Sequence, residues 1–319
     1  MLFQIDRVQR VEVEKDIQYH IFEFIKIIDF EKFKENLING EEGKYKFFSD
    51  IDKKKVKYLL KGKLESICKI HIIIYEEGID KYFLISNENT KVLRCKEYSF
   101  NHISYWFKEL NKKSLQKSES KPLGSAKDDD VDSYVNNIIQ SINGYEKYDD
   151  DCGIGLTKKL LSSDSTSATD FDLFQYIEST DEYIIYEFLK RENENITNKQ
   201  AHPMRYCWTN SSKDNKMKFI SLWRAKKFFN ARLYLINYSD DVNEEISILE
   251  VLELDKNKGI RKELKYCLTY NEFIQWLSDM NTYNNKEKDY LKKFKHRIYD
   301  SKYFDNFNLN KRTYGIENE

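Results

Sequence analysis

The chain has 319 residues, 40% of them hydrophobic and 34% charged, which is enough apolar material for about two folded domains. Its 53 basic and 54 acidic residues almost cancel, and the formal net charge is −1. This composition excludes a globally disordered chain, and no apolar run reaches the roughly 18 residues that a membrane span needs. The N-terminus mixes charged and apolar residues, and the five cysteines form no CxxC pair. We therefore expect a cytoplasmic protein that does not enter a membrane.

Three stretches of the first half recur in the second half, in the same order and at nearly constant offsets of 164, 163 and 170 residues. In the first pair, five of eight residues are identical. The matched stretches are 19–26 with 183–190, 53–75 with 216–238, and 99–111 with 269–281. Because collinear matches at one period indicate a repeat, the sequence predicts an internal duplication.

Each copy predicts a small module of five elements. An opening helix carries Glu23 or Glu187 among apolar residues, and a short aromatic strand and a basic helix follow it. Two strands rich in β-formers come next, and then a closing helix with Trp106 or Trp276. After the opening helix, the expected ranges are 44–48, 53–66, 69–75, 81–86 and 100–111 in the first copy, and 204–208, 216–229, 232–238, 246–254 and 270–281 in the second.

The fold class that we predict is α+β, with two tandem copies of this module joined by a flexible linker. The first module spans 1–112, and a polar, acidic linker with a short helix at 131–142 spans 113–170. The second module spans 171–285. Residues 286–319 form a basic C-terminal helix and tail, because Tyr290, Phe294 and Ile298 recur at helical spacing.

The charge is distributed unevenly along the chain. Residues 44–69 hold nine lysines against three acids, and residues 204–235 hold eight basic residues against one acid. These stretches correspond between the two copies, and acidic runs at 128–132 and 148–151 offset them. Such basic helices are typical of solvated surfaces and also of phosphate-binding surfaces. The candidate nucleic-acid-binding residues are Lys53, Lys54, Lys55, Lys57, Arg205, Lys216, Lys218, Arg224, Lys226 and Lys227.

Chemistry, if the chain is an enzyme, is expected in the second copy. Glu187 is a carboxylate amid apolar residues, which suits a metal ligand or an ion pair with a lysine. Asp214 and Lys216 lie at the turn into the basic helix and complete the candidate catalytic set. Histidines and cysteines have no zinc-ligand spacing, and no phosphate-binding glycine loop occurs.

The order of a Glu-bearing helix, strands, a basic helix and a strand such as 231–238 resembles the PD-(D/E)XK nuclease family in topology, over about 110 residues. The resemblance implies Mg²⁺ held by two carboxylates and a lysine two residues after the second. The nearest carboxylate pair here is Asp241 and Glu250, but Leu252 stands where that lysine would be, and the basic helix precedes these strands. Mg²⁺ is therefore expected only if the chain is nuclease-like.

The sequence predicts a protein that engages nucleic acid through its basic helices, with nuclease-like activity as an open question. The alternative is a non-enzymatic assembly subunit that docks a protein partner. In a third interpretation, the acidic linker covers the basic helices until a partner displaces it.

Overall fold

The computed structural model contains two compact units. The N-terminal unit comprises Gln4–Asp132 and Tyr145–Asp170, and the C-terminal unit comprises Met1–Phe3, Ser133–Gly144 and Phe171–Glu319. The residues that the structure describes are 2–14, 16–38, 48, 50–61, 63–87, 94–114, 121–122, 137, 141–142, 151–162, 165–166, 168–177, 180–191, 195–208, 215–281 and 290–309.

Within these residues, the strands form one mixed sheet of eleven strands, in the order β13-β12-β11-β10-β9-β8-β1-β2-β3-β4-β5, besides a short two-stranded pair. The prediction of two tandem small modules that open with a helix and are joined by a flexible linker is therefore wrong. The stretches expected as opening helices are the strands β2 (Asp16–Lys26) and β9 (Glu182–Lys190). The side chains of β2 are buried without interruption from Tyr19 to Ile25, because both faces of the strand are covered. A short apolar run of this kind is compatible with a buried strand or with a helix, and here it forms a strand.

In the N-terminal unit, β1 (Leu2–Val13) pairs antiparallel with β2, and β2 pairs parallel with β3 (Lys69–Tyr75). The sheet continues antiparallel through β4 (Lys81–Ser86) to β5 (Arg94–Ser99). Helices α3 (Asp50–Lys61) and α4 (Leu64–Ile67) lie in the crossover from β2 to β3. The remaining elements are α1 (Phe30–Ile38), α5 (Phe100–Lys112), β6 (Lys121–Pro122), α7 (Asp151–Leu161) and β7 (Ser165–Thr166).

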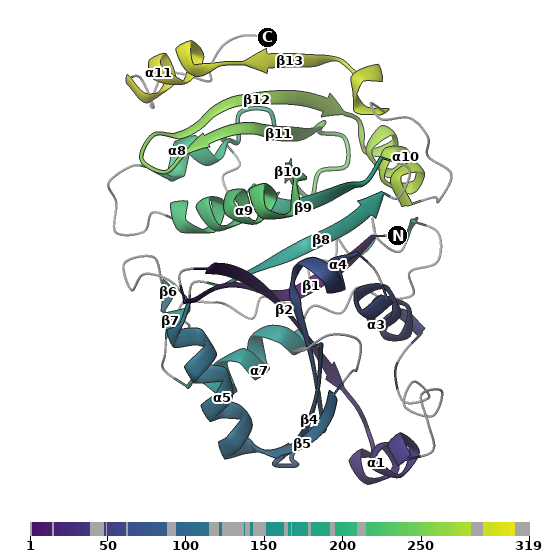
Figure 1. The fold of residues 1–319 in the computed structure, drawn as a ribbon. Coiled ribbons are helices and arrows are strands. Elements are labelled where there is room, and N and C mark those ends of the chain that lie inside the picture. Colours follow the sequence, from purple (N-terminus) through teal and green to yellow (C-terminus); the bar gives the residue numbers. More distant parts are fainter. Residues whose placement is uncertain are drawn as a thin grey trace. The chain divides into compact units, whose positions relative to one another are not determined.

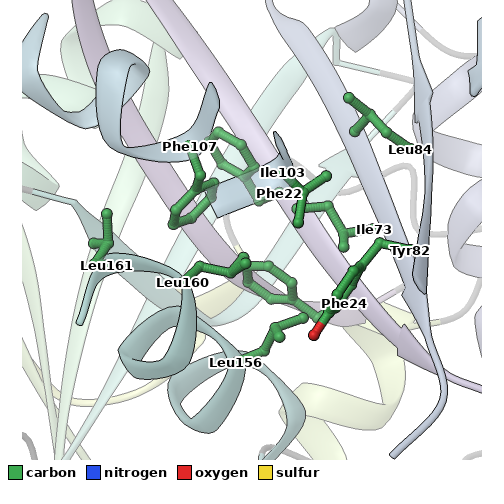
Figure 2. Packing of buried hydrophobic residues seen from close by; sticks show 10 residues of the cluster. All are labelled: Phe22, Phe24, Ile73, Tyr82, Leu84, Ile103, Phe107, Leu156, Leu160 and Leu161. Atoms are coloured by element: carbon green, nitrogen blue, oxygen red, sulfur yellow. The ribbon is translucent and has the colours of Figure 1, made fainter. Parts of the chain in front are cut away.

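The helices of this unit cover both faces of its strands (Figure 1). On one face, residues of α5 and α7 pack against aromatic and aliphatic side chains of β2, β3 and β4 (Figure 2). The members of that cluster are Phe22, Phe24, Ile73, Tyr82, Leu84, Ile103, Phe107, Leu156, Leu160 and Leu161. Helix α7 belongs to the segment that we expected to be a flexible linker, and its leucines form part of this core. The helix predicted at 131–142 lies almost entirely outside the described residues.

The C-terminal unit follows a similar order of elements. Strand β8 (Thr169–Ile177) pairs antiparallel with β9, and β9 pairs parallel with β10 (Ala231–Tyr238) across the helix α9 (Lys216–Phe229). Strands β11 (Ile246–Asp255), β12 (Gly259–Leu268) and β13 (His296–Tyr299) extend the sheet antiparallel. The other elements are α8 (Pro203–Tyr206), α10 (Tyr270–Asn281), a 3₁₀ turn at Tyr290–Lys293 and α11 (Ser301–Leu309).

Several local predictions are confirmed and others are wrong. The basic helix at 216–229 and the closing helix at 270–281 have the predicted bounds. The predicted strand at 204–208 is wrong, because residues 204–206 belong to α8, whose first helical residue is a proline, and residues 207–208 follow it. The helical spacing that begins at Tyr290 predicted a basic C-terminal helix, but that stretch forms a 3₁₀ turn and the strand β13. The predicted strand at 44–48 falls mostly outside the described residues.

Candidate functional site

Each crossover helix directs one lysine inward, onto a glutamate of a central strand. In the N-terminal unit, Lys55 of α3 forms an ion pair with Glu23 of β2. The Nζ atom of Lys55 also lies 3.8 Å from Oδ1 of Asp6, on the neighbouring strand β1. The side chains of Glu23, Asp6 and Lys55 are only 3%, 7% and 11% exposed. This group, which we call the buried triad, therefore lies between the sheet and α3.

Corresponding contacts occur in the C-terminal unit. Lys218 of α9 forms an ion pair with Glu187 of β9, whose side chain is fully buried, while the Lys218 side chain is 24% exposed. Asp172 of β8 accepts a backbone hydrogen bond from the residue after Glu187, at 2.5 Å. Asp6 accepts one from the residue after Glu23, at 2.7 Å. The C-terminal set is therefore the more open of the two.

The three members of the buried triad influence one another's protonation. Burial raises the pKa of Glu23 well above its usual value, and the neighbouring Asp6 raises it further. Burial also raises the pKa of Asp6, although Lys55 and the backbone N–H of Phe24 oppose that shift. Burial disfavours the charge on Lys55, but Glu23 and Asp6 outweigh it and raise the pKa of the lysine. Burial therefore favours a proton on Glu23 more strongly than on Asp6, while the two carboxyls keep the charge on Lys55.

The other cations of the two helices lie nearer to solvent. On α3, Lys54 and Lys57 are exposed and Lys53 is half-buried. Residues two apart on a helix point in nearly opposite directions, so Lys53 and Lys57 face away from the side on which Lys55 enters the sheet. Lys55 thus differs in kind from its neighbours, although the sequence shows a uniform run of lysines.

Helix α9 follows the same principle. Lys227 is exposed, and Lys216, Arg224 and Lys226 are half-buried. The Nζ atoms of Lys226 and Lys227 lie 4.6 and 5.3 Å from the centroid of the Trp223 ring, within cation–π range. Burial lowers the pKa of Lys226. Two of the candidate phosphate-binding cations therefore also cover an indole ring.

The structure does not assemble the expected catalytic set. Glu187 is paired with Lys218, whereas Lys216 is the first residue of α9 and points away from the side of Lys218. Asp214 lies outside the described residues. Arg205 is half-buried on α8, and the side chain of the preceding residue His202 caps this helix by accepting the backbone N–H of Met204. The acidic runs at 128–132 and 148–150 also lie outside the described residues.

The described residues bring together no group of three His, Cys, Asp or Glu side chains that could hold a metal ion. The carboxylate pair suggested by the nuclease resemblance does not form a site either. Asp241 lies in the turn before β11, where its side chain accepts the backbone N–H of Asn243. Glu250 is within β11 and accepts the hydroxyl of Tyr266 at 3.4 Å.

Sequence reasoning identified Glu23, Glu187 and the lysines but missed Asp6 and Asp172. A signal for both aspartates exists in the sequence, because Asp-x-x-Gln occurs at 6–9 and again at 172–175, 166 residues later. The glutamines also have matching contacts. Gln9 donates to the carbonyl of Leu110 at the end of α5, and Gln175 donates to that of Met280 at the end of α10.

Comparison of the chain with protein-family models, curated proteins and solved structures found no match. Among the described residues, no helix is long and apolar enough to cross a membrane.

Proposed function

We propose that the protein binds nucleic acid through the outward-facing cations of α3 and α9. The observation that carries this proposal is that the basic side chains of each helix point in two different directions. One lysine is directed into the sheet and paired with a glutamate, and the remaining cations stay at or near the surface. Lys55 and Lys218 are therefore turned toward the sheet, and the other cations of each helix remain accessible to a ligand at the surface.

The charge of each helix supports a polyanionic partner. Helix α9 contains five basic residues and no acid, and α3 contains five lysines with its two acids confined to the first turn. Because the whole chain carries a net charge of −1, attraction to a polyanion would come from local patches and not from the overall charge. Lys and Arg that contact phosphates release condensed counterions, which makes such binding steeply salt-dependent.

The test is fluorescence anisotropy with a labelled duplex at 50 to 200 mM salt. One variant reverses the charge of three lysines on α3, and a second reverses three cations on α9. The control reverses two exposed lysines at the end of α5, on the opposite face of the N-terminal strands. The three sets are Lys53, Lys54 and Lys57; Lys216, Arg224 and Lys227; and, as control, Lys112 and Lys113.

We expect wild type to bind the duplex with a log–log salt slope of about −0.9 per phosphate contact. Reversal of three contacting cations should reduce the magnitude of that slope by about 2.7, and the control should leave it unchanged. Failure of wild type to bind either the duplex or a single strand of the same length at 50 mM salt would refute the proposal. A duplex affinity that both helix variants retain would refute it as well. The alternative of a protein-docking assembly subunit would then take its place.

Cleavage is not part of the proposal. The group that most resembles the residue set of a metal-dependent nuclease is Asp172, Glu187 and Lys218, which supplies two carboxylates and one lysine. Because the described residues bring no third metal-ligating side chain to them, we derive no Mg²⁺-assisted step. Incubation of the same oligonucleotides with Mg²⁺, followed by a gel, would show whether strand scission accompanies binding.

A further inference from the structure

An exposed tyrosine stands beside basic residues on the C-terminal unit. Tyr206 is the last residue of α8 and is 47% exposed. Its ring centroid lies 6.3 Å from that of Phe219, which is 1% exposed within α9. The aromatic ring is thus anchored on one side by the core and open to solvent on the other.

Helix α8 is held firmly in place. His202 caps its first turn, and the His202 Nε2 atom lies 2.9 Å from the carboxylate of Glu263 on β12. Met204 is fully buried, and its sulfur accepts the backbone N–H of Ile260 at 3.2 Å. Because the backbone that presents Tyr206 is fixed, a ligand that stacks on the ring would have little ordering cost to overcome.

Cations approach the same place from three segments. The Trp208 ring centroid also lies 6.2 Å from that of Phe219, and Trp208 Nε1 donates to the carbonyl of Lys256 in the turn between β11 and β12. Lys256 and Lys258 of that turn are exposed. Figure 1 shows α8 beside this hairpin. Arg205 precedes the tyrosine, and Lys216 lies one turn before Phe219 on α9.

The one acid of the turn is already satisfied. The side chain of Asp255 accepts the backbone N–H groups of Asn257 and Lys258, both at 2.8 Å, and these bonds lower the pKa of Asp255. The negative charge of Asp255 is therefore stabilised by backbone groups of its own turn.

We propose that this surface binds single-stranded nucleic acid, with an unpaired base stacked on Tyr206 and phosphates on Arg205, Lys216, Lys256 and Lys258. The inference rests on the proposed function and names the form of nucleic acid that this part of the protein prefers. A base in a duplex is stacked on its neighbours and has no free face for a tyrosine, whereas a base in a single strand has one. One exposed aromatic ring among four cations is the combination that single-strand binding uses.

The test compares a labelled 15-nucleotide oligo(dT) with a duplex of the same length, by anisotropy at 100 mM salt. Tyr206→Ala should weaken oligo(dT) binding about 5- to 150-fold, the effect of losing one base–aromatic stack, and change duplex binding less than twofold. Tyr206→Phe should keep oligo(dT) affinity within about twofold, because it keeps the ring. The control is Tyr105→Ala, a 67% exposed tyrosine on α5 in the N-terminal unit, which should have no effect.

A second measurement does not depend on any variant. Ultraviolet crosslinking of wild type to oligo(dT), followed by peptide mass spectrometry, should place a crosslink on Tyr206. Reversal of Lys256 and Lys258 together should reduce the magnitude of the oligo(dT) salt slope by about 1.4, at about 0.7 per contact.

The outcomes separate this inference from the proposed function. Salt-sensitive binding of wild type, combined with a Tyr206→Ala variant that behaves as wild type on oligo(dT), would overturn the inference and leave the proposed function standing. Equal losses on oligo(dT) and duplex would also overturn it, because the ring would then not be reading unpaired bases. Failure of wild type to bind either oligonucleotide would refute both.

Discussion

The buried triad makes a counterintuitive prediction for Glu23→Gln. An ion pair with Lys55 would lead one to expect that neutralising Glu23 destabilises the protein, because an unpaired buried charge costs about 3–5 kcal/mol. The structure leads to the opposite expectation. Asp6 also lies beside Lys55, and burial raises the pKa of Glu23 well above its usual value, so folding favours the protonated form of this carboxyl. Glutamine has nearly the same shape and is neutral at every pH.

The magnitude follows from linkage between protonation and folding. The folded-state pKa of Glu23 is raised, so its contribution to stability is fully present below the unfolded pKa of about 4.3 and is lost as the pH rises through the folded pKa. Between those two pKa values the wild type loses about 1.4 kcal/mol per pH unit relative to the Glu23→Gln variant. The stability of Glu23→Gln relative to wild type should therefore rise with pH from about 4.5 and then level off.

Urea unfolding followed by circular dichroism, from pH 4.5 to pH 8, measures this difference. Hydrogen exchange of the peptide that contains β2 assigns the transition to the N-terminal unit. The control is Glu109→Gln, which removes an exposed pair with Lys112 at 2.6 Å and should change stability by less than about 1 kcal/mol without a pH trend. A Glu23→Gln variant that is about 3–5 kcal/mol less stable than wild type, by the same amount at pH 5 and pH 8, would refute the preference for a proton on Glu23.

Three further changes test the packing of the two units. Lys55→Met leaves a buried carboxylate that must be protonated, which costs about 4 kcal/mol at pH 7 and about 1.5 at pH 5, so its urea-unfolding deficit should shrink on acidification. Gln175→Ala removes an amide bonded to a backbone carbonyl and a tyrosine hydroxyl; it should cost about 2–4 kcal/mol in thermal melts, against under about 0.5 for the exposed Gln275→Ala. Gly259→Ala places a Cβ 2.2 Å from a methionine sulfur at φ +82°, and should cost more than Gly78→Ala, which has φ +84° but nothing within 4 Å.

Each of these expectations has a contrary result. An equal deficit of Lys55→Met at pH 5 and pH 7 would mean that no carboxylate depends on this lysine. Equal melting temperatures for the two glutamine variants would mean that the buried amide is dispensable. A Gly259→Ala variant no worse than Gly78→Ala would show that the neighbouring side chains move aside at no cost.

The sequence correctly predicted the amphipathic helices and the strands at 69–75 and 81–86, but it misread the apolar strands β2 and β9 as helices. Helix α9 and the closing helix α10 show helical spacing, and the structure has them at the predicted bounds. Strands β2 and β9 are apolar at nearly every position, so their periodicity carries no information about helix or strand. Strand β12 was missed for the opposite reason, because its charged residues hide its alternation in the sequence GIRKELKYCL.

The sequence predicted most residues of the candidate site, but it did not predict which lysine pairs with which glutamate. Glu23 and Glu187 stand out as carboxylates in apolar surroundings, and a lysine partner was one of their two expected roles. Which lysine of the basic run turns inward depends on the rotation of the helix about its axis. The structure shows this rotation, because Lys218 shares a helix face with the buried Leu222, Ala225 and Phe229. The aspartates were missed because the alignment of the two halves began only after them.

The inward lysines also set a limit on nucleic-acid binding that a count of charges would miss. Helix α3 contains five lysines, but Lys55 belongs to the buried triad, and the outward set that the structure describes is Lys53, Lys54 and Lys57. At about −0.9 per duplex contact, those three can supply a salt slope of about −2.7, where five would supply about −4.5. A reversal of all three that removes about 2.7 from the slope would show that α3 acts only through its outer face. A further loss of about 0.9 on Lys55→Met would instead mean that binding draws Lys55 away from Glu23 and Asp6, so that nucleic acid and the buried triad compete for one ammonium group.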